Sequence, residues 1–198
     1  MVAEQIRARG VRDPRVLDAM LRVPRERFVP PDRQHEAYDD HPIPIGFGQT
    51  ISQPYIVAFM TDALQLAPGH SVLDVGTGSG YQTAVLAELT REVYSIERID
   101  ALAGRARTTL AALGYTNVHV RTGDGYEGWP EHAPYDRILS GAAPEDIPQA
   151  LLDQLADGGI IAIPLGAWDQ QLRVLRKDGD RLETLSTLPV RFVPLIKG

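Results

Sequence analysis

V-L-D-V-G-T-G-S-G-Y, residues 72–81, joins a short apolar run of strand length to three glycines at alternate positions, Gly76, Gly78 and Gly80. Glycine allows the backbone to turn tightly and to approach a ligand closely, where a Cβ atom would intrude. A dinucleotide pyrophosphate site needs G-x-G-x-x-G, but position 81 is tyrosine. The spacing therefore favours a nucleoside ligand without a pyrophosphate, chiefly S-adenosylmethionine, contacted by Gly76, Thr77, Gly78, Ser79 and Gly80.

Three acidic residues, one in or after each of three successive predicted strands, support this prediction. Asp74 is placed to hold the ammonium of a methionine moiety directly or through water. Glu97 ends the second strand, 17 residues after Gly80, where its carboxylate can accept from both ribose hydroxyls. Asp124, in T-G-D-G after the third strand, would reach the adenine edge. Acids at strand ends are also ordinary caps and turn formers, so each of the three alone is an ambiguous signal.

Strand and helix patterns alternate along the rest of the chain. Apolar runs predict strands at 71–75, 92–97, 117–121, 135–140 and 160–165, and helices are predicted at 80–89, 100–113 and 147–155. Asp178-Gly179 between two alternating segments predicts a late β-hairpin, followed by V-R-F-V-P-L-I. This order predicts an α/β fold: a doubly wound, mostly parallel sheet with antiparallel C-terminal strands.

The first fifty residues differ in character from the rest. Asp13 and Pro14 predict the start of a helix, and a proline-dense stretch follows at 24–44. Apolar residues in that stretch indicate an ordered loop, of the kind that forms a lid or a binding rim. We expect a single domain, with residues 1–51 as an N-terminal helical and loop cap and substrate rim, and 52–198 as the S-adenosylmethionine-binding α/β core.

Composition excludes several classes of protein. Hydrophobic residues make up 43% and charged residues 23%, so disorder, collagen and coiled coil are excluded. The absence of cysteine excludes disulfides and thiolate metal sites, and the five histidines show no ligand spacing, so no metal is expected. A net charge of −6 disfavours nucleic acid as a partner. No signal peptide or membrane span is predicted, so a soluble cytoplasmic protein is expected.

Beyond the glycine loop, the chain resembles the protein-L-isoaspartate O-methyltransferase family. The motifs that carry the resemblance are G-Q-T-I-S-Q-P-Y-I-V (48–57), V-L-D-V-G-T-G-S-G-Y-Q (72–82), V-Y-S-I-E-R (93–98), G-D-G (123–125), G-W-P (128–130), A-P-Y-D-R-I (133–138) and R-F-V-P-L (191–195). Many methyltransferases share the glycine loop, whereas T-I-S-Q-P is specific to this family. The resemblance covers the chain from about Val2 to Leu195.

The resemblance implies a single methyltransferase domain, 1–198, with a sheet of the S-adenosylmethionine-dependent methyltransferase type. It also implies methyl transfer from S-adenosylmethionine to the α-carboxylate of isoaspartyl residues in damaged proteins and peptides, by a cytoplasmic monomer. By motif, Ser52 is similar to the family's active-site serine. The positions similar to its cofactor contacts are Asp74, Gly76, Gly78, Glu97, Asp124 and Gly125.

A carboxylate acceptor simplifies the chemistry. Its reference pKa is about 3.3–3.7, so it is already ionised at neutral pH and needs neither a general base nor a metal. The enzyme must supply positioning and desolvation. Ser52 can donate to the acceptor carboxylate, and Gln49 and Thr50 beside it can hold the peptide backbone. Ile45, with Ile43 and Phe47, would form an apolar rim for the peptide, although packing alone explains these three equally well.

Other interpretations remain open from the sequence. Ser52 also precedes a helix predicted from about Gln53 to Leu66, where it could be only an N-cap. Arg191 and Phe192 could close the cleft, but a strand of the sheet is the favoured interpretation there. The rival functions are a nucleic-acid methyltransferase, an enzyme that methylates aspartate in a dedicated partner peptide, and a non-catalytic S-adenosylmethionine-binding protein.

Overall fold

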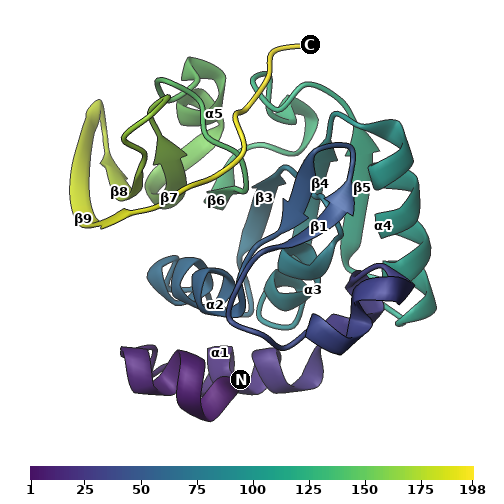
Figure 1. Cartoon of the computed structure of the whole chain (residues 1–198). Coiled ribbons are helices and arrows are strands. Elements are labelled where there is room, and N and C mark those ends of the chain that lie inside the picture. Colours follow the sequence, from purple (N-terminus) through teal and green to yellow (C-terminus); the bar gives the residue numbers. More distant parts are fainter.

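A computed structural model describes all residues, 1–198, and has one seven-stranded sheet at its centre, in the order β5-β4-β3-β6-β7-β8-β9 (Figure 1). The five strands from β5 to β7 are parallel, while β8 and β9 run antiparallel to their neighbours. The predicted fold class is therefore confirmed. The strands are β3 (Ser71–Val75), β4 (Glu92–Glu97), β5 (Val118–Thr122), β6 (Tyr135–Ser140), β7 (Leu155–Leu165), β8 (Gln171–Asp178) and β9 (Arg181–Pro189).

Helices cover both faces of the sheet. Successive side chains of a strand point to opposite faces, so Val72 packs into a large core with helices α1 to α4, and Leu73 into a smaller core beside α5. Burial on both faces explains why all five residues of β3 are buried and why its aliphatic residues point to both faces. The helices are α1 (Pro14–Arg22), α2 (Pro54–Ala63), α3 (Tyr81–Ala87), α4 (Asp100–Ala112) and α5 (Gln149–Gln154). The longest helix, α4, has 13 residues, and none of the helices has the length and hydropathy that a membrane span requires.

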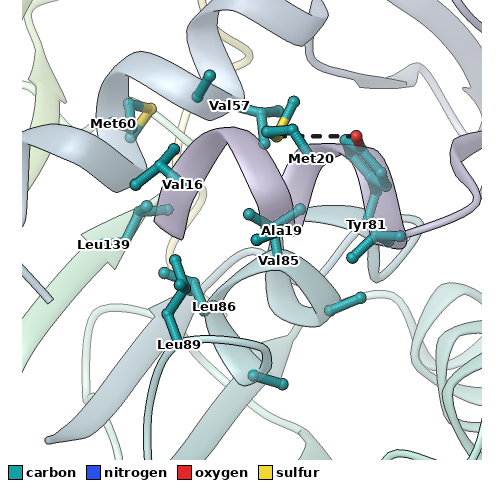
Figure 2. Close-up of a cluster of buried hydrophobic side chains, with 14 of the residues drawn as sticks. Val16, Ala19, Met20, Val57, Met60, Tyr81, Val85, Leu86, Leu89 and Leu139 are labelled. Carbon is teal, nitrogen blue, oxygen red and sulfur yellow. Dashed lines mark hydrogen bonds between the residues drawn. The ribbon is translucent and has the colours of Figure 1, made fainter. Parts of the chain in front are cut away.

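Helix α1 begins as the sequence predicted and packs its buried side chains into the core (Figure 2). The Asp13 side chain accepts from the Arg15 N–H at 2.9 Å, and Pro14 occupies the first helical turn. Its buried face, which includes Val16, Ala19 and Met20, lies against α2 and α3. The first fifty residues thus share the main hydrophobic core with the sheet.

Helix α2 begins one residue later than predicted, and this changes the role of Ser52. The N-cap is Gln53, not Ser52, and no side chain caps the helix. Pro54 stands in the first turn, and a proline forces the residue before it into an extended conformation, so Gln53 has φ −56° and ψ 147°. Ser52 therefore lies outside the helix, and the prediction that it caps α2 is wrong.

The predicted loop before α2 contains a short hairpin, formed by β1 (Ile43–Gly46) and β2 (Gln49–Ile51). Arg105 of α4 anchors this hairpin, because its Nη2 donates to the Ile45 carbonyl at 2.7 Å. Ile43 and Ile45 are buried, whereas Phe47 at the tip is 60% exposed. An ordered segment was expected at this position. Its strand pairing was not predicted, because prolines such as Pro44 in β1 argue against a strand.

The segment after β9, residues 190–196, does not form the strand that was favoured for Arg191 and Phe192. It runs back across the sheet (yellow in Figure 1), and we call it the C-terminal strap. Ala143 donates to the Val193 carbonyl and accepts from the Leu195 N–H, each at 2.8 Å. The Gln170 side chain bonds both the N–H and the carbonyl of Phe192. Pro194 has no N–H to give to a ladder, so the strap makes only an isolated bridge.

Candidate functional site

The glycine loop follows β3 and lies at the carboxyl end of the parallel strands. Gly76, Gly78 and Gly80 have φ angles of 90°, 55° and 89°, which residues with a Cβ rarely adopt. The N–H groups of Gly76 and Thr77 both donate to the Ile96 carbonyl, at 2.8 and 3.1 Å. The end of β4 therefore fixes the backbone of the loop.

The third glycine serves packing within the protein. A Cβ on Gly80 would lie 3.3 Å from both Ala106 Cβ and Leu110 Cδ1 on α4. Gly80 thus allows α3 to approach α4 closely. It does not line the cavity described below, although it was predicted to contact the cofactor.

Glu97 connects the loop to the end of β4. Its Oε2 accepts from the Gly78 N–H at 2.8 Å, and its Oε1 accepts from the Ile99 N–H at 2.9 Å. The side chain is 6% exposed and lines the cavity. Each carboxylate oxygen retains a free lone pair for a ligand hydroxyl.

Asp74 lies beneath the loop and does not reach the cavity. It points to the same face as Val72, the face that α3 covers, and it is only 1% exposed. Its Oδ2 accepts from Thr83 at 2.6 Å and from Ser95 at 2.8 Å, and Ser95 bonds Thr77 of the loop at 2.6 Å. A direct contact of Asp74 with a ligand ammonium is therefore not what the structure shows.

Burial makes Asp74 sensitive to pH. Desolvation outweighs the two hydroxyl donors and raises the pKa of Asp74 to about 6, and its Oδ1 has no partner. A carboxyl whose pKa is raised on folding stabilises the protein below its unfolded pKa of 3.8, and this stabilisation is lost as the pH rises through about 6.

We therefore expect Asp74→Asn to change the pH dependence of stability. Between about pH 4 and pH 7 the wild type should lose about 2 kcal/mol of unfolding free energy relative to the variant. Urea unfolding of both proteins across this range measures the difference. Parallel stability curves would show that Asp74 does not titrate as the structure indicates.

A small cavity of about 80 Å³ opens above the loop. Of the predicted cofactor and peptide residues, it is lined by Gln49, Thr50, Gly76, Gly78, Glu97 and Gly125. The strap residues Val193 to Ile196 form its outer wall. Ligand pockets usually measure about 300–1,000 Å³, so a nucleoside needs either a displaced strap or the adjoining space.

Asp124 stands behind this cavity rather than in its wall. Its Oδ1 accepts from the Tyr126 N–H and its Oδ2 from the Gly198 N–H, both at 2.8 Å. The neighbouring Gly125 does line the cavity, and a Cβ there would come within 2.6 Å of Val75 Cγ1. At this turn the backbone, and not the predicted carboxylate, faces the cavity.

A second cavity, of about 790 Å³, contains Ser52. Two arginines, Arg9 and Arg191, line it, and no acidic residue does. Arg9 is paired with Asp40 at 2.9 Å and lies 3.5 Å above the Tyr55 ring. The strap residues Arg191 and Phe192 form its far side, which is the interpretation the sequence had disfavoured.

The two cavities meet along three shared residues, Thr50, Gly141 and Val193. Thr50 therefore joins the space around Ser52 to the space around Glu97. A third cavity, of about 890 Å³, lies against the strap as well, lined by Glu145, Asp146 and Trp168 among others. The strap thus borders all three.

Some predicted residues lie elsewhere, and some lining residues were missed. Ile45 and Ser79 line a separate cavity of about 150 Å³ with Gly78, and Thr77 is buried in the Asp74 network. The lining residues that the sequence did not identify include Arg9, Gln53, Tyr55, Gly141 and Val193. Gly141 could have been identified from the sequence, because a glycine directly after a predicted strand is typical of a ligand-binding turn. Nothing in the sequence indicates a site role for Arg9.

Comparisons with known proteins agree along the whole chain. The family model described as protein-L-isoaspartate(D-aspartate) O-methyltransferase matches residues 1–198. A protein-L-isoaspartate O-methyltransferase from Synechococcus sp. is 57% identical over 204 residues, covering 99% of this chain and 84% of its own. One from Gloeobacter violaceus is 55% identical over 199 residues, covering 100% and 97%.

A solved structure has the same fold. It comes from Plasmodium falciparum and is described as a protein-L-isoaspartate O-methyltransferase in complex with S-adenosyl-L-homocysteine. Its TM-score is 0.84 at 27% identity, and the match covers 100% of this chain and 97% of that one.

Proposed function

Because the chain belongs to the protein-L-isoaspartate(D-aspartate) O-methyltransferase family, we propose that its two joined cavities divide the reaction of that family between them. This reaction is the methylation of L-isoaspartyl residues by S-adenosyl-L-methionine, which is the first step of protein repair. The smaller cavity holds the nucleoside of the cofactor, and the larger holds the isoaspartyl peptide. The observation that carries this proposal is their junction at Thr50, with Ser52 on one side and Glu97 on the other.

The residues of the smaller cavity suit the cofactor. S-adenosyl-L-methionine supplies a sulfonium-bound methyl group. Glu97 offers carboxylate lone pairs to ribose hydroxyls, and Ile96 and Ile99 offer apolar walls to a base. The positive φ angles of Gly76 and Gly78 leave their backbone open to the ligand. Asp74 and Thr77 support this surface from below and do not touch the ligand, and Asp124 holds the turn that places Gly125.

Charge and apolar surface suit the larger cavity to a peptide carboxylate. Arg191 favours an anion there, and Arg9 adds less because Asp40 already pairs with it; the acceptor is ionised at neutral pH without help from a base. The Ser52 hydroxyl donates to one oxygen of the acceptor and leaves the other directed toward the junction. Thr50 and Gln49 hold the backbone beside it, and Phe192 covers it against water. Ile45 supports the hairpin from behind instead of contacting the peptide.

Glu97→Gln tests the cofactor side. The amide of glutamine keeps one acceptor oxygen but turns its N–H₂ group toward the N–H of either Gly78 or Ile99. It also removes the charge from the hydrogen bonds to the ribose hydroxyls, which are worth about 1.5–3 kcal/mol when charge-assisted. We expect the KM for S-adenosyl-L-methionine to rise about tenfold or more, with the KM for peptide nearly unchanged. Steady-state kinetics with each substrate varied in turn measures both constants.

Glu92→Gln, at the opposite end of the same strand, is the matched control. Glu92 pairs with His119 on the surface and should leave both constants at their wild-type values. An unchanged cofactor KM in Glu97→Gln would reduce Glu97 to a support of the glycine loop.

We also propose that the protein acts as a monomer in the cytoplasm. Residues of one chain line both cavities, so neither substrate needs a second copy. Sedimentation velocity with and without cofactor measures the oligomeric state.

Methyl incorporation from labelled cofactor into a synthetic isoaspartyl peptide and its aspartyl twin tests the reaction. Base-labile label on the isoaspartyl peptide alone is the expected result. Label on the aspartyl twin would favour an enzyme for a dedicated partner peptide, and no label with either would contradict methyl transfer to isoaspartate.

A further inference from the structure

Arg25 is an arginine buried without an acidic partner. It belongs to the 3₁₀ helix Arg25–Phe28, outside both cavities, and its side chain is 0% exposed. Burial lowers the pKa of Arg25 to about 10, so the guanidinium is still charged at neutral pH. A buried charge without a counter-charge destabilises a fold unless its hydrogen bonds compensate, so its presence here requires a reason.

Backbone carbonyls are the partners of this guanidinium. Its Nε donates to the Ala37 carbonyl at 2.7 Å, and its Nη2 donates to the Ser52 carbonyl at 2.8 Å. The remaining nitrogen, Nη1, is buried with no partner. Stability alone would favour a side chain that satisfies all its donors, whereas this one leaves a nitrogen unpaired while it holds two carbonyls, one of which belongs to the functional residue Ser52.

The same guanidinium also contacts the segment after the glycine loop. It lies 4.7 Å from the centre of the Tyr81 ring, and Tyr81 follows Gly80 directly as the first residue of α3. Tyr81 is itself buried against Met20 of α1, so it cannot easily move (Figure 2). One rigid, planar group therefore connects the Ser52 backbone to the end of the loop beneath the cofactor.

We propose that Arg25 is a positioning residue for methyl transfer: by holding the Ser52 carbonyl against the first turn of α3, it sets the direction of the Ser52 hydroxyl relative to the glycine loop. This inference rests on the proposed role of Ser52. An in-line displacement tolerates little misalignment, because a shift of about 1 Å costs about a hundredfold in rate. Ser52 needs such an external hold because it lies outside α2.

Arg25→Met and Arg137→Met form a matched pair. Arg137 also reaches across to α2, where its Nε donates to the Leu64 carbonyl at 2.5 Å, but at the end of the helix away from Ser52. Both variants remove a guanidinium that holds the backbone next to α2. Activity is measured at a temperature at which near-ultraviolet circular dichroism shows each variant to be folded.

For Arg25→Met we expect kcat to fall about a hundredfold, with the KM for cofactor changed less than about threefold. Arg25→Lys, which keeps one donor, should recover part of the rate, and Arg137→Met should keep the wild-type kcat. When Arg25→Met is added to Ser52→Ala, kcat should fall by less than about threefold relative to Ser52→Ala alone, because the Ser52 hydroxyl that Arg25 positions is already gone.

Two results would overturn the inference. If Ser52→Ala lowers kcat while Arg25→Met lowers it no more than Arg137→Met, Arg25 is structural only. If the effects of Arg25→Met and Ser52→Ala multiply fully, Arg25 does not act through Ser52. A Ser52→Ala protein with the wild-type kcat is a different outcome, since it contradicts the proposed role of Ser52 itself.

Discussion

Ser52→Asp is expected to give a folded protein that binds S-adenosyl-L-methionine normally and methylates isoaspartyl peptide about a hundredfold more slowly than the wild type, or slower still. The lost donor alone accounts for about 10- to 150-fold, because hydrogen bonds to charged groups contribute about 1.5–3 kcal/mol. A second carboxylate beside the acceptor then adds repulsion. Melting temperature, cofactor affinity and kcat are the quantities to measure.

The position of Ser52 makes simpler variants informative as well. Because Gln53 is the N-cap of α2, Ser52→Ala removes a hydroxyl without removing a cap, and its melting temperature should stay close to that of the wild type. Ser52→Thr keeps the hydroxyl and should keep much of the rate. The Asp variant should regain activity as the pH falls toward about 5, where the new carboxyl takes up a proton and can donate. Wild-type kcat in Ser52→Asp would remove Ser52 from the mechanism.

Gly125→Ala should damage both stability and cofactor binding. The added Cβ would lie 2.6 Å from Val75 Cγ1 and 3.0 Å from Leu195 Cδ1, so the end of β3 or the strap must shift. Overpacking of this kind costs about 1–3 kcal/mol, which for a chain of this length lowers the melting temperature by about 2–12 °C. Since Gly125 also lines the cofactor cavity, the Kd for S-adenosyl-L-methionine should rise at least about tenfold.

Gly123→Ala, two residues earlier, is the control for Gly125→Ala. Its Cβ would meet Arg121 Nε at 3.5 Å and Ile96 Cγ2 at 3.6 Å, which are ordinary contacts. Calorimetry and cofactor titration should therefore separate the two variants clearly. Equal behaviour would mean that the Gly125 turn is loose enough to accept a side chain.

Local patterns explain why most of the fold could be predicted. The strands at 71–75, 92–97 and 135–140 have the predicted bounds, because buried parallel strands form unbroken apolar runs between turn residues. The start of β7 at Leu155 was missed. The glycines at 158 and 159 indicate a turn, and Gly158 does leave the extended conformation with φ 72°, but this is an irregularity within the strand, because pairing with β6 holds at Leu155 and resumes at Ile160.

The site was predictable only where a role follows from the backbone. Gly76 and Gly78 could be identified from their spacing, and Glu97 from its place at a strand end. The position of Asp74 depends on which face of β3 it shares, and residue type alone does not reveal that α3 covers this face. Arg9 and Val193 reach the Ser52 cavity from opposite ends of the chain, and only tertiary packing brings them together.

The C-terminal strap gives the two substrates a wall in common, and this makes their affinities interdependent. With the strap in place the cofactor cavity measures about 80 Å³, so a bound nucleoside either displaces the strap or extends past Thr50, Gly141 and Val193 into the peptide cavity, and either change alters the space left for the peptide. Linkage requires that the factor by which cofactor changes peptide affinity equals the factor by which peptide changes cofactor affinity. The concentration of damaged protein at which repair becomes half-maximal is then not a fixed constant of the enzyme, but varies with the cofactor supply.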